Sequence, residues 1–136
     1  MIIIACIDNS GGMMFNKRRL SRDKSVMSDI QTMLGSRPLY MNEYSYSMFS
    51  EYSPKTACTV SDDFLNKAGQ NDYCFIENQD IGIFKEKING LVLYRWNRDY
   101  PSDFRFELSL DDWILTEVRD FQGISHNRIT KEVYIK

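Results

Sequence analysis

The sequence predicts an α/β fold built on one mixed β-sheet, parallel early in the chain and antiparallel in its C-terminal strands. Up to Gly90, short apolar strand-like runs alternate with helix-like segments, which is typical of parallel strands joined by helical crossovers. After Gly90, strand-like segments follow one another with only polar turns between them, which is typical of an antiparallel meander. At 136 residues the chain can bury one sizeable core, so we expect a single domain over residues 1–136.

The first strand is predicted over residues 2–8, a continuous apolar run typical of a strand covered on both faces. The first helix is predicted over residues 26–34, where apolar residues recur at helical spacing. Ser21 or Asp23 can cap the start of this helix, and Gly35 can end it. The beginning of the chain is thus a buried strand followed by an amphipathic helix.

The same signals predict the remaining elements. The alternating part continues with a strand at 38–41, a short helix through 48–49, a strand at 56–60, a brief helix capped by Ser61-Asp62 and ended by Gly69, a strand at 72–76 and a helix at 81–88. The final part contains strands at 91–96, 104–108, 113–121 and 130–135. No repeat, low-complexity tract or flexible linker interrupts this order.

Composition narrows the possible function classes. Hydrophobic residues make up 43% and charged residues 26% of the chain, as in ordinary soluble proteins. The net charge of -2 gives no whole-molecule attraction to nucleic acid or to an anionic membrane. No apolar run approaches the roughly 20 residues of a membrane span, and no basic region precedes the first run as in a signal peptide. We therefore expect no membrane association.

The cysteines indicate a reducing compartment. Cys6, Cys58 and Cys74 lie in apolar strand-like segments, without Cys-x-x-Cys spacing. An odd number of cysteines does not suggest a secreted disulfide scaffold. One histidine and three scattered cysteines also give no zinc ligand cluster. We expect three small buried residues, no metal and a cytoplasmic location.

Motifs occur along nearly the whole chain in a recognisable order. They are Ile4-Ala5-Cys6-Ile7-Asp8 with a Gly11-Gly12 turn, Leu20-Ser21-Arg22-Asp23, the run from Arg37 to Tyr46, Cys74-Phe75-Ile76-Glu77-Asn78, Ser102 to Phe106, Leu110 to Trp113, and Ser125-His126. In this order and spacing, residues 2–134 resemble the dihydrofolate reductase family. The resemblance implies an eight-stranded sheet flanked by about four helices.

The resemblance also implies a pterin-type substrate pocket in which Asp23 is the catalytic carboxylate. A buried acid suits that role because desolvation raises its pKa and lets it support proton delivery. The competing interpretation of Asp23 is a helix N-cap. Further substrate-binding positions are implied for Ala5 and Cys6, for Met27 in place of a ring-packing aromatic, for Lys55 near the residue that grips the substrate tail, and for Tyr94 in place of a threonine that bonds the carboxylate.

The cofactor side of the resemblance is altered. Dinucleotide sites use glycine because backbone amides must approach the pyrophosphate closely. Where the family has Gly-Gly, this chain has Glu77-Asn78, and where the family has Gly-Arg it has Asn42-Glu43. Both changes place negative charge at an anion site, so we expect no NADPH cofactor. Remnants of the cofactor site are Ser45 and Ser61.

A basic cluster precedes the first helix. Five positive charges fall within eight residues: Lys17, Arg18, Arg19, Arg22 and Lys24. On the loop that would cover the pocket mouth, they could meet an acidic protein surface, a nucleotide or RNA. The competing interpretation is a solvated loop. His126, the single histidine, is expected in a structural or turn role.

Together these observations predict a divergent dihydrofolate reductase-like protein that acts as a non-catalytic binding or regulatory module. It would bind a small-molecule ligand or a protein partner, for example as an immunity or antitoxin-type protein. One alternative is an NADPH-dependent reductase of a pterin-like substrate, with NADP as cofactor and Asp23 as the active-site acid. A weaker alternative is a nucleic-acid-processing protein that uses the basic cluster.

Overall fold

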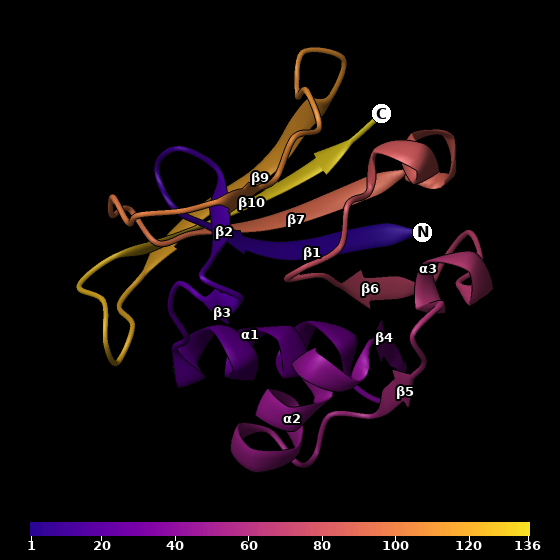
Figure 1. Ribbon diagram of the computed structural model, residues 1–136, viewed down its shortest axis with the longest axis horizontal. Helices are drawn as coiled ribbons and strands as arrows, with labels where there is room; N and C mark the ends of the chain where they lie inside the picture. Colours follow the sequence, from indigo (N-terminus) through magenta and orange to yellow (C-terminus); the bar gives the residue numbers. More distant parts are fainter.

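A computed structural model describes all residues from 1 to 136 and contains one large mixed sheet. The seven strands of this sheet lie in the order β5-β4-β6-β1-β7-β10-β9 (Figure 1). Their bounds are β5 Cys58–Val60, β4 Leu39–Met41, β6 Tyr73–Phe75, β1 Ile2–Ile7, β7 Gly90–Arg95, β10 Ile129–Ile135 and β9 Ile114–Phe121. The strands from β5 to β7 are parallel, whereas β10 is antiparallel to β7 and β9 to β10. The predicted mixed sheet is confirmed.

A second, small sheet was not predicted. It contains β3 (Arg18–Arg19), β2 (Gly12–Phe15) and β8 (Phe104–Arg105), in that order. The strand predicted at 104–108 is therefore only two residues long, and it pairs with β2 instead of entering the large sheet. The turn between β2 and β3 has left-handed backbone angles at Asn16 and Lys17, so a tight hairpin lies where the sequence indicated only a basic loop.

The helices agree with the predicted ones in order. They are α1 Lys24–Leu34, α2 Glu43–Tyr52, α3 Phe64–Lys67 and a 3-10 helix at Gly82–Lys87. Asp23 caps α1 by accepting from the Ser25 N–H, and Gly35 ends α1 with a left-handed φ of 61°. Asn42 caps α2 in the same way through the Ser45 N–H. The last helix is 3-10 instead of α, and none of its residues is buried.

Two hydrophobic cores lie on the two faces of the sheet. Helices α1 and α2 cover one face, where Ile30 and Phe49 pack against Phe75 and Val92. On the other face, Phe64 of α3 and the β2 residues Met13 and Met14 belong to the core that includes Ile3 and Leu91.

None of the helices has the length and apolar character needed to cross a membrane. All three cysteines are free, and Cys74 alone is fully buried.

This topology brings polar residues together at one edge of the sheet. Asp8 follows β1, Asn42 follows β4 and Glu77 lies two residues beyond β6, and all three are buried. Because these strands are parallel, their carboxyl ends meet at the same edge, which is where open α/β sheets bind ligands. The candidate site is therefore expected there.

Candidate functional site

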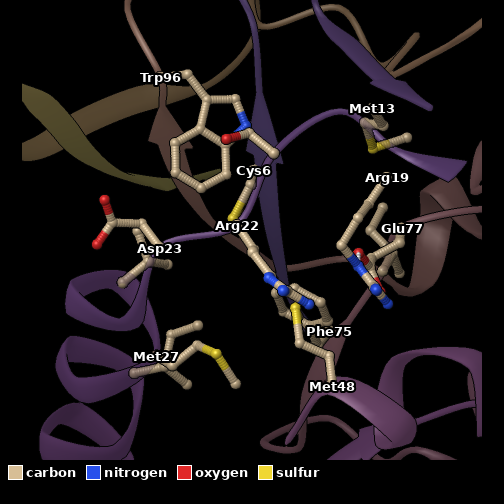
Figure 2. Close-up of a pocket in the computed structure, with 14 residues that line it drawn as sticks. Cys6, Met13, Arg19, Arg22, Asp23, Met27, Met48, Phe75, Glu77 and Trp96 are labelled. Atoms are coloured by element: carbon tan, nitrogen blue, oxygen red, sulfur yellow. Dashed lines mark hydrogen bonds and ion pairs between the residues drawn. The ribbon is translucent and has the colours of Figure 1, made fainter. Parts of the chain in front are cut away.

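A small cavity lies beyond the carboxyl ends of the central strands, between β1, the β3 hairpin, α1 and α2 (Figure 2). Its lining side chains include Cys6, Arg19, Arg22, Met27, Met48, Glu77 and Trp96. The space free for the centre of a water molecule is about 20 Å³, which is room for about one water. Small-molecule pockets have roughly 300–1,000 Å³. A pterin-sized ligand therefore requires lining side chains to move.

An ion pair between Arg19 and Glu77 closes one side of this cavity. Arg19 Nε donates to Glu77 Oε2 at 2.7 Å, and its Nη2 donates to Oε1 at 3.1 Å. The Ser45 hydroxyl donates to the same Oε1 at 2.9 Å. Burial alone lowers the pKa of Arg19, but the hydrogen bond and charge of Glu77 raise it overall. The Glu77 carboxylate is thus satisfied by groups from the small sheet and from α2.

The same contacts change the interpretation of the cofactor side. The sequence indicated that Glu77 would present an uncompensated charge to phosphate, whereas the structure neutralises it with Arg19. The neighbouring amides are also paired, because Asn42 Nδ2 donates to Asn78 Oδ1 at 2.9 Å. Internal pairs therefore join the strand ends where the family resemblance places pyrophosphate. Ser61, the other predicted remnant, bonds Asp63 and Lys67 at the end of β5.

Asp23 ties the start of α1 to the loop between β9 and β10. Its carboxylate accepts from the backbone N–H groups of Ser25 at 2.9 Å, Ile124 at 3.0 Å and Ser125 at 2.7 Å. Gly123 packs so closely that an added Cβ would lie 2.4 Å from Asp23 Oδ2. In Figure 2 the carboxylate points away from Met48 and Phe75. The N-cap interpretation of Asp23 is therefore the one that the geometry satisfies.

The charge state of Asp23 also differs from the one that a catalytic acid needs. Burial raises the pKa of Asp23, but the three backbone N–H donors and His126 outweigh burial and lower it to about 2. The raised pKa expected from desolvation is thus wrong, because the sequence did not reveal these donors. In this conformation Asp23 is an ionised structural carboxylate. Its role as a catalytic acid stays a prediction of the reductase alternative.

His126 completes the polar network, and no sequence pattern indicated its partners. The ring is 3% exposed and stacks on Trp96 with centroids 4.5 Å apart. Its Nδ1 lies 3.3 Å from Asp23 Oδ2, while its Nε2 lies 3.0 Å from both the Ser21 and the Tyr100 hydroxyls. With Asp23 as the acceptor at Nδ1, the proton lies on Nδ1 and Nε2 accepts from a hydroxyl.

A serine hydroxyl that contacts a histidine, which in turn contacts an aspartate, is the arrangement used for nucleophilic catalysis. Here two hydroxyls compete for the one Nε2 lone pair, and the cavity beside Ser21 has room for about one water. These conditions favour a structural latch over an activated nucleophile. The latch fastens the loop after β9 to the N-terminus of α1, which agrees with the structural role expected of His126.

The predicted substrate residues are only partly brought together. Cys6 and Met27 line the cavity, whereas Ala5 is buried in the core of the opposite face. Lys55 is exposed and does not line the cavity. The Tyr94 hydroxyl donates to Asp29 at 2.6 Å instead of to Asp23. A structural network of Asp29 with Tyr94, Arg119 and Lys131 therefore replaces the contact expected at Tyr94.

The predicted basic cluster divides into three parts. Lys17 and Arg18 are exposed at the β2–β3 hairpin, and Arg19 pairs with Glu77. Arg22 lies over the Tyr52 ring at 4.4 Å and Lys24 at 5.4 Å, at the end of α2. The expectation of one continuous basic loop is wrong, because β3 folds Arg19 inward and α1 begins immediately after Asp23.

Arg22 and Lys24 border a second cavity that adjoins the first. It has about 250 Å³ of space and is lined by Arg22, Asp23, Lys24, Met27, Tyr52, Ile124 and Ser125. Neither cation forms an ion pair within the chain, while Asp23 is occupied by its backbone donors. The second cavity thus combines two free positive charges, an aromatic face and an apolar side chain. Nowhere do three His, Cys, Asp or Glu side chains converge to hold a metal ion.

The fold is similar to that of a dihydrofolate reductase from Enterococcus faecalis, solved in complex with NADP(H) and RAB-propyl. The match has a TM-score of 0.68 and covers 98% of this chain and 94% of that chain, with 9% sequence identity. No protein-family model and no curated protein matches the sequence. At this identity the likeness concerns the fold and not the activity. The chain has a divergent dihydrofolate reductase-like fold, as its motif order predicted.

Proposed function

We propose that this chain is a dihydrofolate reductase-like binding module that takes no nicotinamide cofactor. The observation that carries this proposal is the ion pair of Arg19 with Glu77 at the strand ends, where Ser45 also bonds Glu77 and the two charged side chains are 19% and 8% exposed. A phosphate at these strand ends would compete with Glu77 for Arg19, and loss of Arg19 would leave the largely buried Glu77 carboxylate without its cation, which costs free energy. The Glu77 carboxylate would then face a phosphate.

Calorimetric titration with NADPH tests the cofactor part of the proposal. We expect no binding at micromolar nucleotide for the wild-type chain. The double variant Glu43→Arg with Glu77→Gly should bind measurably, because it removes two acids and frees Arg19 to meet phosphate. A wild-type dissociation constant in the low micromolar range would contradict the proposal and favour the reductase alternative. Dihydrofolate reduction, followed by loss of NADPH absorbance, would establish that alternative directly.

The binding partner in this proposal is acidic and docks at the second cavity. Arg22 and Lys24 are its free cations, and Tyr52 and Ile124 supply apolar surface beside them. This combination suits a carboxylate-bearing or phosphate-bearing segment with an apolar neighbour. An immunity or antitoxin-type role, in which the partner is a protein, is the form of the proposal that we favour. The cations at this cavity also suit a nucleic acid, which the same test separates.

A pull-down from host extract at low and moderate salt identifies the partner. We compare the wild-type chain with Arg22→Ser/Lys24→Ser and with a matched control, Lys17→Ser/Arg18→Ser, that removes equal charge from the hairpin tip. The cavity variant should lose the partner and the control should keep it, with recovery falling as salt rises. Loss with the control alone would assign binding to the hairpin. A nuclease-sensitive partner would favour the nucleic-acid alternative.

A further inference from the structure

Strand β9 leaves a long edge of the large sheet open. It spans eight residues, Ile114–Phe121, and pairs only with β10. The opposite edge strand, β5, has three residues (Figure 1). Edge strands are usually kept short or protected by lysine or proline, because their free N–H and C=O groups recruit other strands. β9 contains neither residue type, and Ile114, Leu115 and Val118 on it are 58%, 48% and 58% exposed.

The sequence of β9 is complementary to its own reverse. We propose that β9 pairs antiparallel with β9 of a second copy of this chain, about a two-fold axis at Val118. In this register Glu117 of each copy lies opposite Arg119 of the other, and Val118 lies opposite itself. Because directly opposed residues share a sheet face, the two cross-strand ion pairs and the contact between the two Val118 side chains form by symmetry.

The surroundings of these charges favour a second copy over another partner. Arg119 bonds Asp29 and lies over the Phe121 ring, yet its side chain is 45% exposed and can take a second carboxylate. Glu117 is 51% exposed, and its nearest cation is Lys131 at 4.0 Å. Pairing of two β9 strands would therefore place acidic and basic side chains alternately along one face of the joined sheet. A partner strand with only acidic or only basic side chains would place a like charge opposite either Glu117 or Arg119. A second β9 places an opposite charge at both positions.

The size of the contact sets the expected strength. One added strand pair buries less surface than the roughly 1,200–2,000 Å² of stable interfaces. β9 also carries an irregularity between its partners Val133 and Tyr134, which leaves Glu117 to Phe121 as its regular part. We therefore expect a weak dimer that forms as concentration rises. The axis at Val118 places both ion pairs within this regular part of the strand.

Sedimentation velocity across a series from micromolar to millimolar protein tests the pairing. We expect the wild-type chain to approach a particle of twice its 16.0 kDa mass. Glu117→Arg and Arg119→Glu each place like charges opposite one another twice, so each variant alone should associate about tenfold to thirtyfold more weakly. An equimolar mixture of the two variants restores opposite charges at both pairs and should associate like wild type. The matched control, Glu86→Arg on the exposed 3-10 helix, should behave as wild type.

Several results would overturn the proposal. They are a wild-type chain that stays monomeric throughout the series, single variants that associate as strongly as wild type, or a mixture that associates no better than its components. Thermal unfolding of each variant alone checks that it folds, since Arg119→Glu also removes the contact with Asp29. If that variant does not fold, Val118→Lys takes its place. It sets two lysines against each other on the axis, and unchanged association would refute the register.

Discussion

Replacing Asp23 by asparagine tests the view that this residue is a structural anchor. Asparagine keeps one acceptor oxygen and is itself a good N-cap, so the start of α1 should survive. The amide nitrogen, however, takes the place of Oδ2 and presents hydrogens toward the backbone N–H of Ser125, whereas Ser25 and Ile124 both donate to Oδ1. The change therefore keeps the cap and removes one of the two backbone contacts with the loop after β9.

The size of the effect follows from the pKa of Asp23. Folding lowers that pKa from 3.8 to about 2, and each unit corresponds to 1.36 kcal/mol. Ionised Asp23 thus contributes about 2 kcal/mol to the free energy of unfolding. Because the folded pKa is depressed, this stabilisation is fully present above pH 3.8 and is lost as pH falls toward about 2. At neutral pH we expect Asp23→Asn to lower the free energy of unfolding by about 2–3 kcal/mol.

Urea denaturation followed by circular dichroism, repeated from neutral pH to about pH 2, measures both quantities. The difference between wild type and Asp23→Asn should be constant near neutrality and should shrink as the solution becomes acidic through the window below pH 3.8. Asp112→Asn is the control, since that side chain is exposed. Parallel profiles for wild type and Asp23→Asn across the whole range would refute the reasoning. A wild-type chain that is less stable at neutral pH than at acidic pH would instead indicate a raised pKa of Asp23, as the catalytic role requires.

Three further changes test the packing around the site. Gly123→Ala should cost about 1–3 kcal/mol, measured by the same denaturation, because the new Cβ would lie 2.4 Å from Asp23 Oδ2; an unchanged midpoint would show that the loop relaxes freely. Tyr94→Phe should cost about 1.5 kcal/mol through loss of the 2.6 Å hydrogen bond to Asp29, and a neutral result would assign Asp29 to its cations alone. Phe49→Ala should cost about 3–5 kcal/mol, because Phe49 is fully buried on α2, and a loss below 1 kcal/mol would contradict its place in the core.

The elements of the fold could be predicted because their signals are local. Apolar periodicity predicted α1. The residues that cap this helix lie within one turn of its ends, at Asp23 and Gly35. The alternation of strands and helices before Gly90 and the meander after it indicated the sheet. The short strands of the small sheet carry no such pattern. β3 and β8 have two residues each, too few to show a period.

The interior of the site could not be predicted, because its partners are distant in sequence. Arg19 and Glu77 are 58 residues apart, and each was interpreted from its neighbours, as a loop cation and as a phosphate-repelling acid. Their opposite signs at positions that the resemblance places on one pocket were the available signal. The sequence around His126 contained no signal for its partners, because a single histidine after a serine does not indicate which of the preceding residues it will contact.

The contact of Asp23 with Ile124 and Ser125 has a consequence for biosynthesis. A ribosome delivers α1 long before the loop after β9, whose N–H groups lie 101 and 102 positions further on. Until that loop emerges, the carboxylate at the start of α1 has only its local partner, Ser25, and the latch through His126 cannot close. The cavity is therefore completed only after residue 126 has emerged, and a nascent chain stalled before residue 124 should expose it to chaperones and proteases.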